Sequence, residues 1–377
     1  MVNCMRIVVI GGGPSGMMAA ISSKKHHPES EVFLLERNKL LGKKMRLTGG
    51  GRCNVTANVE ASEVVSNTPK NGRFLYSALS NFNPQKIITF FEDNGCPLKE
   101  EDHGRMFPES NRSKDIVETL QNVLIKSGVK ILYDQKVNSI DLNPKKIHTE
   151  TDTFTFDKLI LCAGGKTLPG TGSDGSGYDL VKQMGHSVTD ILPAEVPLVS
   201  NDTFIQEKVL QGLSFQDVNV KVYHKKKIKS NITHDLLFTH FGLSGPAALR
   251  SSFEVQKLLG EPIELSIDFF PEASTLDETH FNYQKRLIDY VSSLEGDLWQ
   301  NLKNFKMSVY DTRGFKYAFV SNGGVSLKEV DPKTMKSKLN SDISIAGELL
   351  DMSSFTGGYN ITSALVSGYT AGKFVSL

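Results

Sequence analysis

Apolar residues near the start of the chain form two short runs separated by a glycine-rich turn. Residues 5–10 are an almost continuous run of β-forming apolar side chains, which is typical of a buried parallel strand. A helix-like stretch follows the glycines, and a second apolar run at residues 31–35 ends at Glu36. The pattern therefore predicts a strand, a tight turn, a helix and a second strand.

The turn carries the spacing of a dinucleotide-binding fingerprint. Gly11 permits a tight turn, Gly13 lets the backbone approach a pyrophosphate, and Gly16 lets the helix pack closely on the strand. Amides at the start of the helix would face the phosphate charge. Glu36 ends the second strand, where a carboxylate accepts hydrogen bonds from ribose hydroxyls. A structural glycine turn is the alternative, and the strand–helix context favours dinucleotide binding.

Two later stretches repeat the combination of a strand with glycines. Residues 157–162 run into Ala163, Gly164 and Gly165, which predicts a second close approach of backbone to ligand. Residues 343–346 lead to Gly347 and to two carboxylates, Glu348 and Asp351, and a Gly357–Gly358 turn then opens a final helix. The extra acceptors favour FAD over a nicotinamide nucleotide, because FAD has a ribityl chain to hold. Cys162 is interpreted as a small buried residue and not as a reactive thiol.

Residues 48–54 combine three successive glycines with an arginine and an asparagine. This segment offers backbone amides, a guanidinium and a carboxamide, which suit phosphate oxygens or the polar edge of a ring. A mobile glycine loop is the alternative interpretation.

The middle of the chain changes character. Short β-like runs separated by polar turns over residues 198–268 predict a separate, mostly antiparallel domain, and residues 279–304 predict a short helical segment. Before it, residues 86–94 and 113–127 read as amphipathic helices, with a loop at 102–108. The predicted domains are a discontinuous FAD-binding domain at 1–192 and 316–377, a β-rich substrate domain at 193–270 and 305–315, and a small helical subdomain at 271–304.

Composition excludes several classes of function. The chain has 377 residues and a formal net charge of +1, which indicates no nucleic-acid partner. Its four cysteines contain no CxxC pair, which argues against a disulfide framework, a zinc site and a dithiol centre. No apolar run approaches the roughly 20 residues that span a bilayer. The first strand begins almost at the N-terminus, so we expect no signal peptide and a cytoplasmic protein without a membrane partner.

Together these segments resemble the BaiN-type family of FAD-dependent oxidoreductases, a group that also contains aminoacetone oxidase. The resemblance covers nearly the whole chain, although the segment at 48–54 lacks the serine of the family's TSGGGRCN motif and residues 270–306 are short for its helical subdomain. The matching motifs lie at residues 11–16, 48–54, 171–175, 238–246, 323–325 and 346–360. The resemblance implies an α/β fold of the two-dinucleotide-binding-domain type, a discontinuous Rossmann-like FAD domain with an inserted antiparallel β-rich domain and a small helical subdomain.

The resemblance also implies where a non-covalent FAD is held. Residues 11–15 would hold the pyrophosphate, Glu36 the adenosine ribose and Val137 the adenine through its backbone. Residues 52–54 would lie along the flavin, Gly347 to Asp351 would serve the ribityl and phosphate region, and residues 358–361 the pyrimidine edge. The full predicted cofactor-binding set is Gly11, Gly13, Pro14, Ser15, Gly16, Glu36, Arg37, Lys44, Thr48, Gly50, Gly51, Arg52, Cys53, Asn54, Val137, Ala163, Gly164, Gly165, Gly347, Glu348, Asp351, Gly357, Gly358, Tyr359, Asn360 and Ile361.

Thr239, His240 and Tyr359 are the predicted substrate-side residues, although His240 is equally compatible with a structural histidine. No residue stands out as a catalytic base, and no metal is predicted. Because the chain has a single dinucleotide fingerprint, the sequence favours an oxidase that passes electrons from a small amine or amino ketone to O2, with aminoacetone as the specific hypothesis. The alternatives are an NAD(P)H-dependent reductase of a conjugated carbonyl or steroid-like compound, and a flavin-containing redox sensor or RNA-modification-linked protein.

Overall fold

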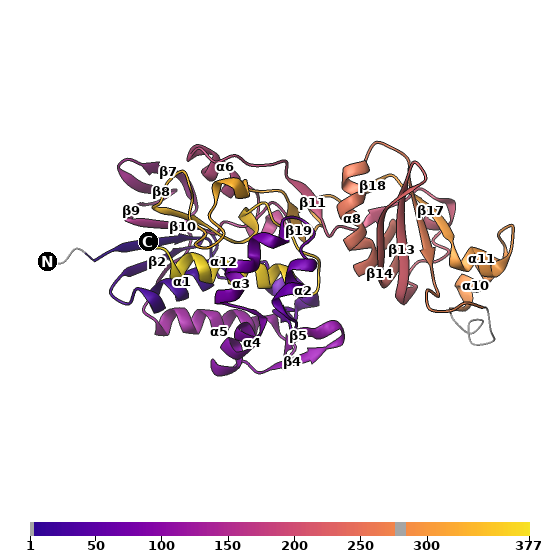
Figure 1. Ribbon diagram of the computed structural model, residues 1–377, viewed down its shortest axis with the longest axis horizontal. Helices are drawn as coiled ribbons and strands as arrows, with labels where there is room; N and C mark the ends of the chain where they lie inside the picture. The colour runs from indigo at the N-terminus through magenta and orange to yellow at the C-terminus, as the bar shows by residue number, and fades with distance from the viewer. Residues whose placement is uncertain (1–3, 276–283) are drawn as a thin grey trace. The chain divides into compact units, whose positions relative to one another are not determined.

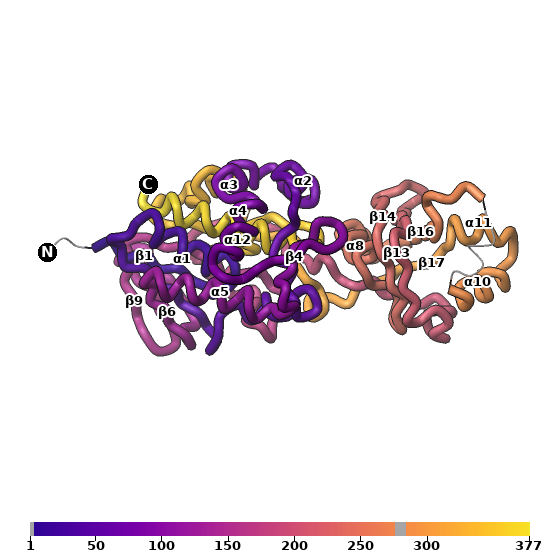
Figure 2. The backbone as a smooth tube through the Cα atoms, turned by 90° about the horizontal axis from the view of Figure 1, so that it is seen from below, coloured from indigo at the N-terminus to yellow at the C-terminus, as the bar shows by residue number. Residues whose placement is uncertain are grey.

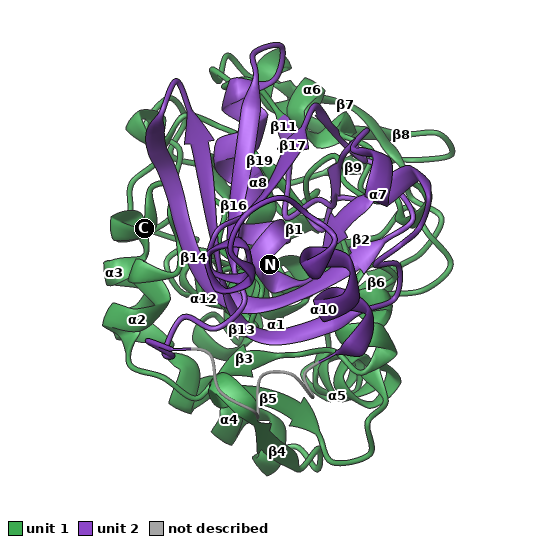
Figure 3. Cartoon of the chain, turned by 90° about the vertical axis from the view of Figure 1, so that its right-hand side faces the viewer, with its two compact units in different colours: residues 1–191, 320–377 green, residues 192–319 purple. Residues whose placement is uncertain are grey.

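The structure divides into two units, each with its own sheets and core (Figure 3). The computed structural model describes residues 4–275 and 284–377, so residues 276–283 of the expected helical subdomain lie outside the described residues. Unit 1 comprises Met1–Ile191 and Val320–Leu377, and unit 2 comprises Leu192–Phe319. The finer division into three domains remains a proposal.

A parallel sheet forms the centre of unit 1. Its strand order is β20–β10–β1–β2–β6, and each neighbouring pair is parallel. The strands are β1 (Arg6–Ile10), β2 (Glu31–Leu35), β6 (Lys130–Leu132), β10 (Lys158–Leu161) and β20 (Ile343–Ile345). The predicted Rossmann-like strands at 5–10, 31–35 and 157–162 are therefore confirmed, because their apolar runs are buried in this sheet.

Smaller elements surround this sheet. Two antiparallel sheets have the orders β3–β5–β4 and β7–β8–β9. The remaining strands of unit 1 are β3 (Thr56–Ala57), β4 (Leu98–Glu101), β5 (Arg105–Pro108), β7 (Val137–Leu142), β8 (Lys145–Thr149), β9 (Thr153–Thr155) and β19 (Val320–Asn322). Its α-helices are α1 (Pro14–His26), α2 (Ala61–Ser66), α3 (Tyr76–Asn81), α4 (Pro84–Asp93), α5 (Ser113–Lys126), α6 (Ser176–Gln183) and α12 (Tyr359–Lys373), and its 3-10 turns are η1 (Met45–Gly51), η2 (Gly72–Leu75), η3 (Asp102–Gly104), η4 (Pro169–Thr171), η5 (Leu327–Glu329) and η6 (Gly347–Leu349).

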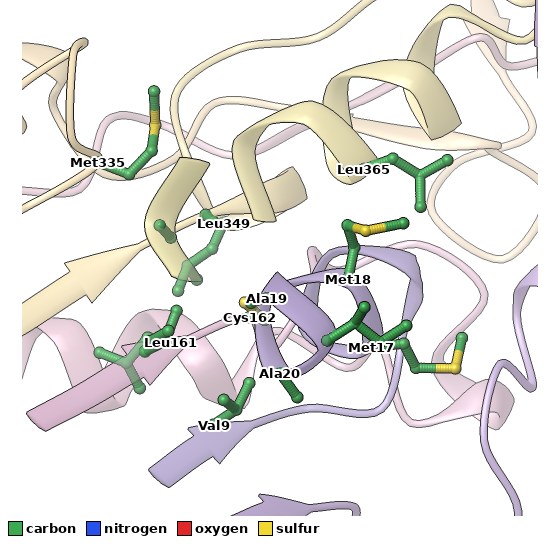
Figure 4. Packing of buried hydrophobic residues seen from close by; sticks show 14 of the residues in the cluster. Val9, Met17, Met18, Ala19, Ala20, Leu161, Cys162, Met335, Leu349 and Leu365 are labelled. Atoms are coloured by element: carbon green, nitrogen blue, oxygen red, sulfur yellow. The ribbon is translucent and has the colours of Figure 1, made fainter. Parts of the chain in front are cut away.

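The first and last helices of unit 1 pack against each other (Figures 1 and 2). Small residues make this approach possible, because a Cβ added at Gly368 or Gly372 would lie 2.2 Å from a carbonyl oxygen of α1. Apolar side chains from β1, β10, α1 and α12 then form one buried cluster around Val9, Leu161 and Leu365 (Figure 4). The C-terminal segment is thereby part of the same core as the N-terminal turn.

One expected loop is a hairpin. Residues 102–108 were expected to be irregular, but β4 and β5 pair antiparallel and only η3 separates them. His103 occupies the turn with a left-handed φ of 56° and is exposed. The prediction failed because the apolar residues Met106 and Phe107 are buried by β3 and neighbouring segments, which a local pattern does not reveal.

Unit 2 is built on an antiparallel sheet, as the alternating pattern predicted. Its strand order is β17–β16–β13–β14–β15–β12–β18. The strands of the unit are β11 (Leu192–Ala194), β12 (Leu198–Val199), β13 (Ser214–His224), β14 (Lys227–Thr239), β15 (Gly242–Ser244), β16 (Ile263–Asp268), β17 (Phe305–Val309) and β18 (Asp311–Thr312), and its helices are α7 (Thr203–Gln206), α8 (Pro246–Leu258), α10 (Lys285–Ser292) and α11 (Leu298–Lys303). Helix α8 was missed by the sequence reading; its proline at the first helical position fits the N-terminus of a helix.

Asp342 of unit 1 forms an ion cluster with two lysines, and this cluster predicts how the stability of the fold depends on pH. Asp342 lies 2.6 Å from Lys145 Nζ and 2.8 Å from Lys158 Nζ, and hydrogen bonds from these two lysines hold the pKa of Asp342 below its ordinary value of 3.8. Because the pKa of Asp342 is lowered in the folded state, its ionised carboxylate stabilises the fold at pH values above 3.8. This stability is lost as the pH falls through the lowered pKa. We expect Asp342→Asn to lower the free energy of unfolding by about 1 kcal/mol at neutral pH. In urea titrations the difference from the unchanged protein should vanish in strong acid; a difference that persists there would contradict the assignment.

Candidate functional site

The predicted ligand-binding segments meet at one edge of the parallel sheet. In the sheet, β1 lies between β2 and β10. The chain continues from β1 to β2 on one side, whereas β10 is followed by β20 on the other side, so the order of the strands reverses between β1 and β10. In open α/β sheets, ligands bind at the carboxyl ends of the strands at such a switch point. The glycine turn after β1 and the Ala163–Gly165 stretch after β10 both lie at this edge.

The glycine turn is held by close backbone contacts. The Gly11 amide donates to Leu35 O at 2.8 Å, and a Cβ added at Gly11 would lie 2.3 Å from Cys162 O. A Cβ at Gly16 would lie 1.8 Å from Gly11 O, so the helix packs directly on the turn. A Cβ at Gly13, by contrast, would meet no atom of residues 4–275 and 284–377 within 4 Å. Gly11 and Gly16 therefore close the turn, while Gly13 faces open space.

Glu36 joins the turn to the segment after β2. Its carboxylate is buried, with Oε2 accepting from the Gly12 amide at 2.7 Å and Oε1 accepting from the Asn38 amide at 2.8 Å and Asn38 Nδ2 at 2.6 Å. Arg37 beside it pairs with Asp174 at 2.7 Å, and donates to Gly172 O at 3.1 Å. Glu36, the residue predicted to bind the ribose, thus lies at the end of β2 with its carboxylate held in one orientation.

Lys44 and Glu348, 304 residues apart, form an ion pair. Lys44 Nζ lies 2.9 Å from Glu348 Oε2 and donates to Thr167 Oγ1 at 2.6 Å, while Glu348 Oε1 accepts from the Ser321 amide at 2.9 Å. Gly347 lies beside α1, because a Cβ added there would be 2.8 Å from Ser15 Cβ. The segments after β2, β10 and β20 are therefore tied together around the start of α1.

The segment at 48–54 adopts a backbone that glycine favours. Gly49, Gly50 and Gly51 have φ values of 57°, 67° and 86°, and Thr48 Oγ1 donates to Met45 O at 2.7 Å. Arg52 lies over the Phe107 ring at 4.1 Å and donates to both Glu101 oxygens at 2.9 and 3.0 Å. Its guanidinium is thus held by the β4–β5 hairpin.

Asn54 places an unsatisfied acceptor beside the turn before α12. Its Oδ1 is buried and accepts no hydrogen bond within residues 4–275 and 284–377, and a Cβ added at Gly358 would lie 3.0 Å from it. Gly358 is the N-cap of α12, and no side chain among the described residues caps this helix. An acceptor without a donor among the described residues therefore lies beside the start of α12.

The remaining predicted residues lie around this edge or away from it. Val137 begins β7, two residues after Gln135, whose amide donates to Glu36 O at 2.9 Å. Asp351 pairs with Lys70 at 2.7 Å. The hydroxyl of Tyr359 donates to Glu63 Oε1 at 3.4 Å, and Asn360 binds the backbone of Ser354. Ile361 follows in the first turn of α12.

Thr239 and His240 belong to unit 2. Thr239 ends β14 and its Oγ1 donates to Gly242 O at 3.0 Å, whereas His240 is exposed in the turn that follows. Their substrate-side role remains a proposal.

The structure adds polar residues that the sequence reading missed. Asn38, Thr167, Ser321 and Lys70 each contact a predicted site residue, and Ser173 Oγ is buried without a hydrogen-bond partner in the described chain. Only Ser173 carried a signal, because it lies in the glycine loop at 171–175. The others depend on contacts between distant segments.

The buried cysteines are unsuited to thiolate chemistry. Burial raises the pKa of both Cys53 and Cys162 to about 12, which confirms that Cys162 is a buried thiol. At neutral pH roughly one thiol in 100,000 is then ionised, and the thiolate is the reactive form.

We expect iodoacetamide to modify the exposed Cys4 in the folded protein and to leave Cys53 and Cys162 unmodified, as read by peptide mass spectrometry. Denatured protein, in which all cysteines react, is the control; equally fast modification of Cys53 without denaturant would contradict this.

The donors and acceptors at the sheet edge fit FAD. The N-terminus of α1 has no side-chain cap from the described part of the chain and opens toward the space at Gly13, which suits a pyrophosphate. Glu36 suits ribose hydroxyls, and the orphaned Asn54 Oδ1 and Ser173 Oγ would be satisfied by polar groups of a ligand. No group of three or more His, Cys, Asp or Glu side chains that could hold a metal occurs within the described residues.

A Rossmann-type sheet with this edge defines the class of dinucleotide-binding proteins. A family model described as "HI0933-like protein Rossmann domain" matches residues 5–374. The chain belongs to this HI0933-like family, as the resemblance to BaiN-type proteins implied, and it is an FAD-dependent oxidoreductase.

Two curated relatives match the chain along its length. A 3-dehydro-bile acid delta(4,6)-reductase from Clostridium scindens is 30% identical, covering 98% of this chain and 98% of that protein. A ribosomal RNA dihydrouridine synthase from Haemophilus influenzae is 28% identical with the same coverage of both chains.

Among solved structures, the 3-ketosteroid delta1-dehydrogenase from Sterolibacterium denitrificans has a TM-score of 0.55 at 11% identity. The match covers both chains completely, which shows a shared fold. None of the described helices is both long and apolar enough to cross a membrane.

Proposed function

We propose that the chain reduces a carbon–carbon double bond conjugated to a carbonyl group in a small molecule, with NAD(P)H as electron donor. The observation that carries the proposal is that two full-length relatives have names describing hydrogen addition to such bonds, in a 3-dehydro bile acid and in uridine. This was the second of the hypotheses drawn from the sequence.

The predicted cofactor-binding residues have distinct parts in this proposal. When bound, FAD supplies the centre that exchanges a hydride with donor and substrate. The amides at the start of α1 would hold the pyrophosphate and Glu36 the ribose, while the Lys44–Glu348 pair fixes the segment after β20. The N-terminus of α12 would stabilise negative charge on the cofactor, and Asn54 Oδ1 would accept a hydrogen bond from one of its polar groups.

Anaerobic stopped-flow mixing tests the proposal. Purified FAD-loaded protein is mixed with NADPH or NADH and then with a 3-oxo-4-ene steroid, a uridine oligonucleotide or, as the matched control, a saturated 3-oxo steroid. We expect the flavin absorbance to bleach with the nucleotide and to return only with a conjugated carbonyl. If no conjugated carbonyl restores it, the proposal is wrong.

The oxidase hypothesis rests on a different observation, the single dinucleotide fingerprint of the chain. It predicts that aminoacetone bleaches the flavin without NADPH and that O2 restores it with formation of hydrogen peroxide. No peroxide from aminoacetone or other small amines in air would contradict the hypothesis. The oxidase hypothesis and the cytoplasmic location both remain predictions.

RNA modification is the third candidate, favoured by the dihydrouridine synthase relative. A net charge of +1 argues against it, because nucleic-acid binding draws on clustered positive charge. Reoxidation of the flavin by the uridine oligonucleotide and by none of the small carbonyls would favour this candidate.

A further inference from the structure

The segment that follows Glu36 in unit 1 is rich in positive charge. Residues 37–52 contain six lysines and arginines and no acidic residue. Three of these cations have partners elsewhere in unit 1, in the ion pairs Arg37–Asp174, Lys44–Glu348 and Arg52–Glu101. The other three, Lys39, Lys43 and Arg46, form no ion pair with any residue that the structure describes. The segment therefore carries positive charge that no described acid neutralises.

A helical turn sorts the side chains of this segment into a buried and an exposed face. Residues 42–46 close the turn with a hydrogen bond of 3.0 Å from the last amide to the first carbonyl. Residues four apart share one face of such a turn. Leu41 and Met45 are buried, whereas Lys43 and Leu47 are exposed. The outer face thus carries a cation and an apolar side chain together.

Exposed leucines and bare backbone accompany the cations. Leu47 is 56% exposed and Leu40 is 41% exposed, although a leucine side chain stabilises a structure only when it is covered. Gly50 and Gly51 are exposed, and a Cβ added at either would meet no described atom within 4 Å. The exposed residues of this segment are called the basic surface below: Lys39, Leu40, Lys43, Leu47, Gly50 and Gly51.

The basic surface belongs to the same stretch of chain as several predicted cofactor-binding residues. It begins three residues after Glu36 and ends three residues before Asn54, and Lys44 lies within it. The one dinucleotide fingerprint of the chain, at residues 11–16, is assigned to FAD. A protein donor of electrons needs no second fingerprint, because it carries its own redox centre.

We propose that the basic surface binds a small acidic electron-carrier protein, which reduces the flavin as a second donor besides NAD(P)H. Complexes between redox proteins are weak, with interfaces below about 1,200 Å², and opposite charges steer the partners together. Lys39 and Lys43 attract the acidic carrier, the two leucines form the apolar centre of the contact, and the bare glycines let the carrier approach closely. The inference goes beyond the proposed function and holds whichever substrate the flavin reduces.

The electron transfer is balanced without a further reactant. Two reduced one-electron carriers each give up one electron, and these two electrons with two protons from water reduce one bound FAD. An anionic lipid surface is the less suitable occupant, because two leucines bury little apolar area in a membrane and stable binding there needs more.

Anaerobic stopped-flow mixing of the FAD-loaded protein with a pre-reduced acidic [2Fe–2S] ferredoxin tests the proposal. We expect the second-order rate constant of flavin bleaching to fall steeply as salt rises from about 0.01 M to about 0.15 M. The double variant Lys39→Gln/Lys43→Gln should lower this rate constant about 3- to 10-fold at low salt and leave reduction by NADPH unchanged. Lys328→Gln/Lys333→Gln removes the same charge from two exposed lysines of another segment and should react like the unchanged protein.

Leu47→Gln separates the docked complex from the encounter. Apolar contact stabilises the complex after it has formed, whereas charge acts mainly on the rate of encounter. We therefore expect this variant to raise the Kd for oxidised ferredoxin roughly 3- to 10-fold in calorimetric titration. The salt dependence of its bleaching rate should match that of the unchanged protein.

Several results would overturn the proposal. These are a flavin that NADPH reduces and ferredoxin does not, an unchanged rate constant in the double lysine variant, or an equal loss in its reduction by NADPH. Vesicles of phosphatidylserine and phosphatidylcholine that bind the unchanged protein and not this variant, with unchanged reaction with ferredoxin, would assign the surface to lipid instead. Thermal melts and flavin content report folding, and Lys43→Gln alone keeps the test valid if the double variant fails to fold.

The inference and the proposed function fail separately. If no conjugated carbonyl reoxidises the flavin while ferredoxin still reduces it in a manner that depends on Lys39 and Lys43, the reductase proposal falls and the carrier surface stands. If NADPH and a conjugated carbonyl both react while ferredoxin does not, the reverse holds.

Discussion

Replacing Gly16 with alanine is expected to destabilise unit 1 by about 3 kcal/mol or to prevent its folding, since overpacking against backbone cannot be relieved by a rotamer change. The new Cβ would lie 1.8 Å from Gly11 O and 3.3 Å from Cys162 Cβ, so α1 would have to move away from the sheet. Because α12 packs on α1, the displacement would spread through the shared core. Urea titration followed by circular dichroism measures the loss.

Gly13→Ala is the matched variant, since the same methyl group would meet no atom of the described residues within 4 Å. We expect it to fold with unchanged stability of the flavin-free protein and to lose FAD, because the methyl group enters the space assigned to the pyrophosphate. Flavin absorbance after gel filtration reports binding. A Gly13→Ala protein that retains its flavin would show that the pyrophosphate does not lie over this residue.

Substituting the buried carboxylate of Glu36 by Gln is expected to have the second largest effect. The carboxylate accepts from two backbone amides and from Asn38 Nδ2, and a carboxamide turns one acceptor into a donor that faces donors. We expect a loss of about 2 kcal/mol in stability and a roughly 10- to 100-fold rise in the Kd for FAD, as for a lost hydrogen bond to a charged group. Fluorescence titration of flavin-free protein measures the affinity.

Glu31→Gln is the control on the same strand. Glu31 is partly exposed and pairs with Lys130 at 2.6 Å at the other end of β2, away from the glycine turn. We expect its FAD affinity to match that of the unchanged protein. Equal weakening in both variants would mean that the loss reflects charge or strand stability, and Glu36 would then have no specific part in binding FAD.

The local rules of sequence reading worked where a segment's role depends on its own residues. The apolar runs at 5–10, 31–35 and 157–162 became buried parallel strands, since side chains covered on both faces leave a continuous apolar pattern. The antiparallel character of unit 2, predicted from its short β-like runs and polar turns, was confirmed as well, and the family and the FAD cofactor were confirmed by the match to the family model. The individual cofactor contacts and the domain boundaries remain predictions.

The reading failed where burial by distant segments decided the outcome. Residues 102–108, which contain η3 and β5 of the hairpin, were expected as a loop because their apolar run is short and flanked by charges. Helix α8 was missed within a stretch whose other runs are β-like, although its apolar side is buried against the sheet of unit 2.

By itself the sequence determined that a glycine turn follows a buried strand, that an acid ends the next strand, and that a second glycine turn opens the last helix. These features are local, because backbone clashes and strand burial act over a few residues. Only the tertiary structure decided that Lys44 pairs with Glu348, that Asn54 Oδ1 lies beside Gly358 with no donor among the described residues, and that Arg313 stacks on Phe241. Such partners are brought together by the packing of strands and helices far apart in the chain, and no local pattern encodes that packing.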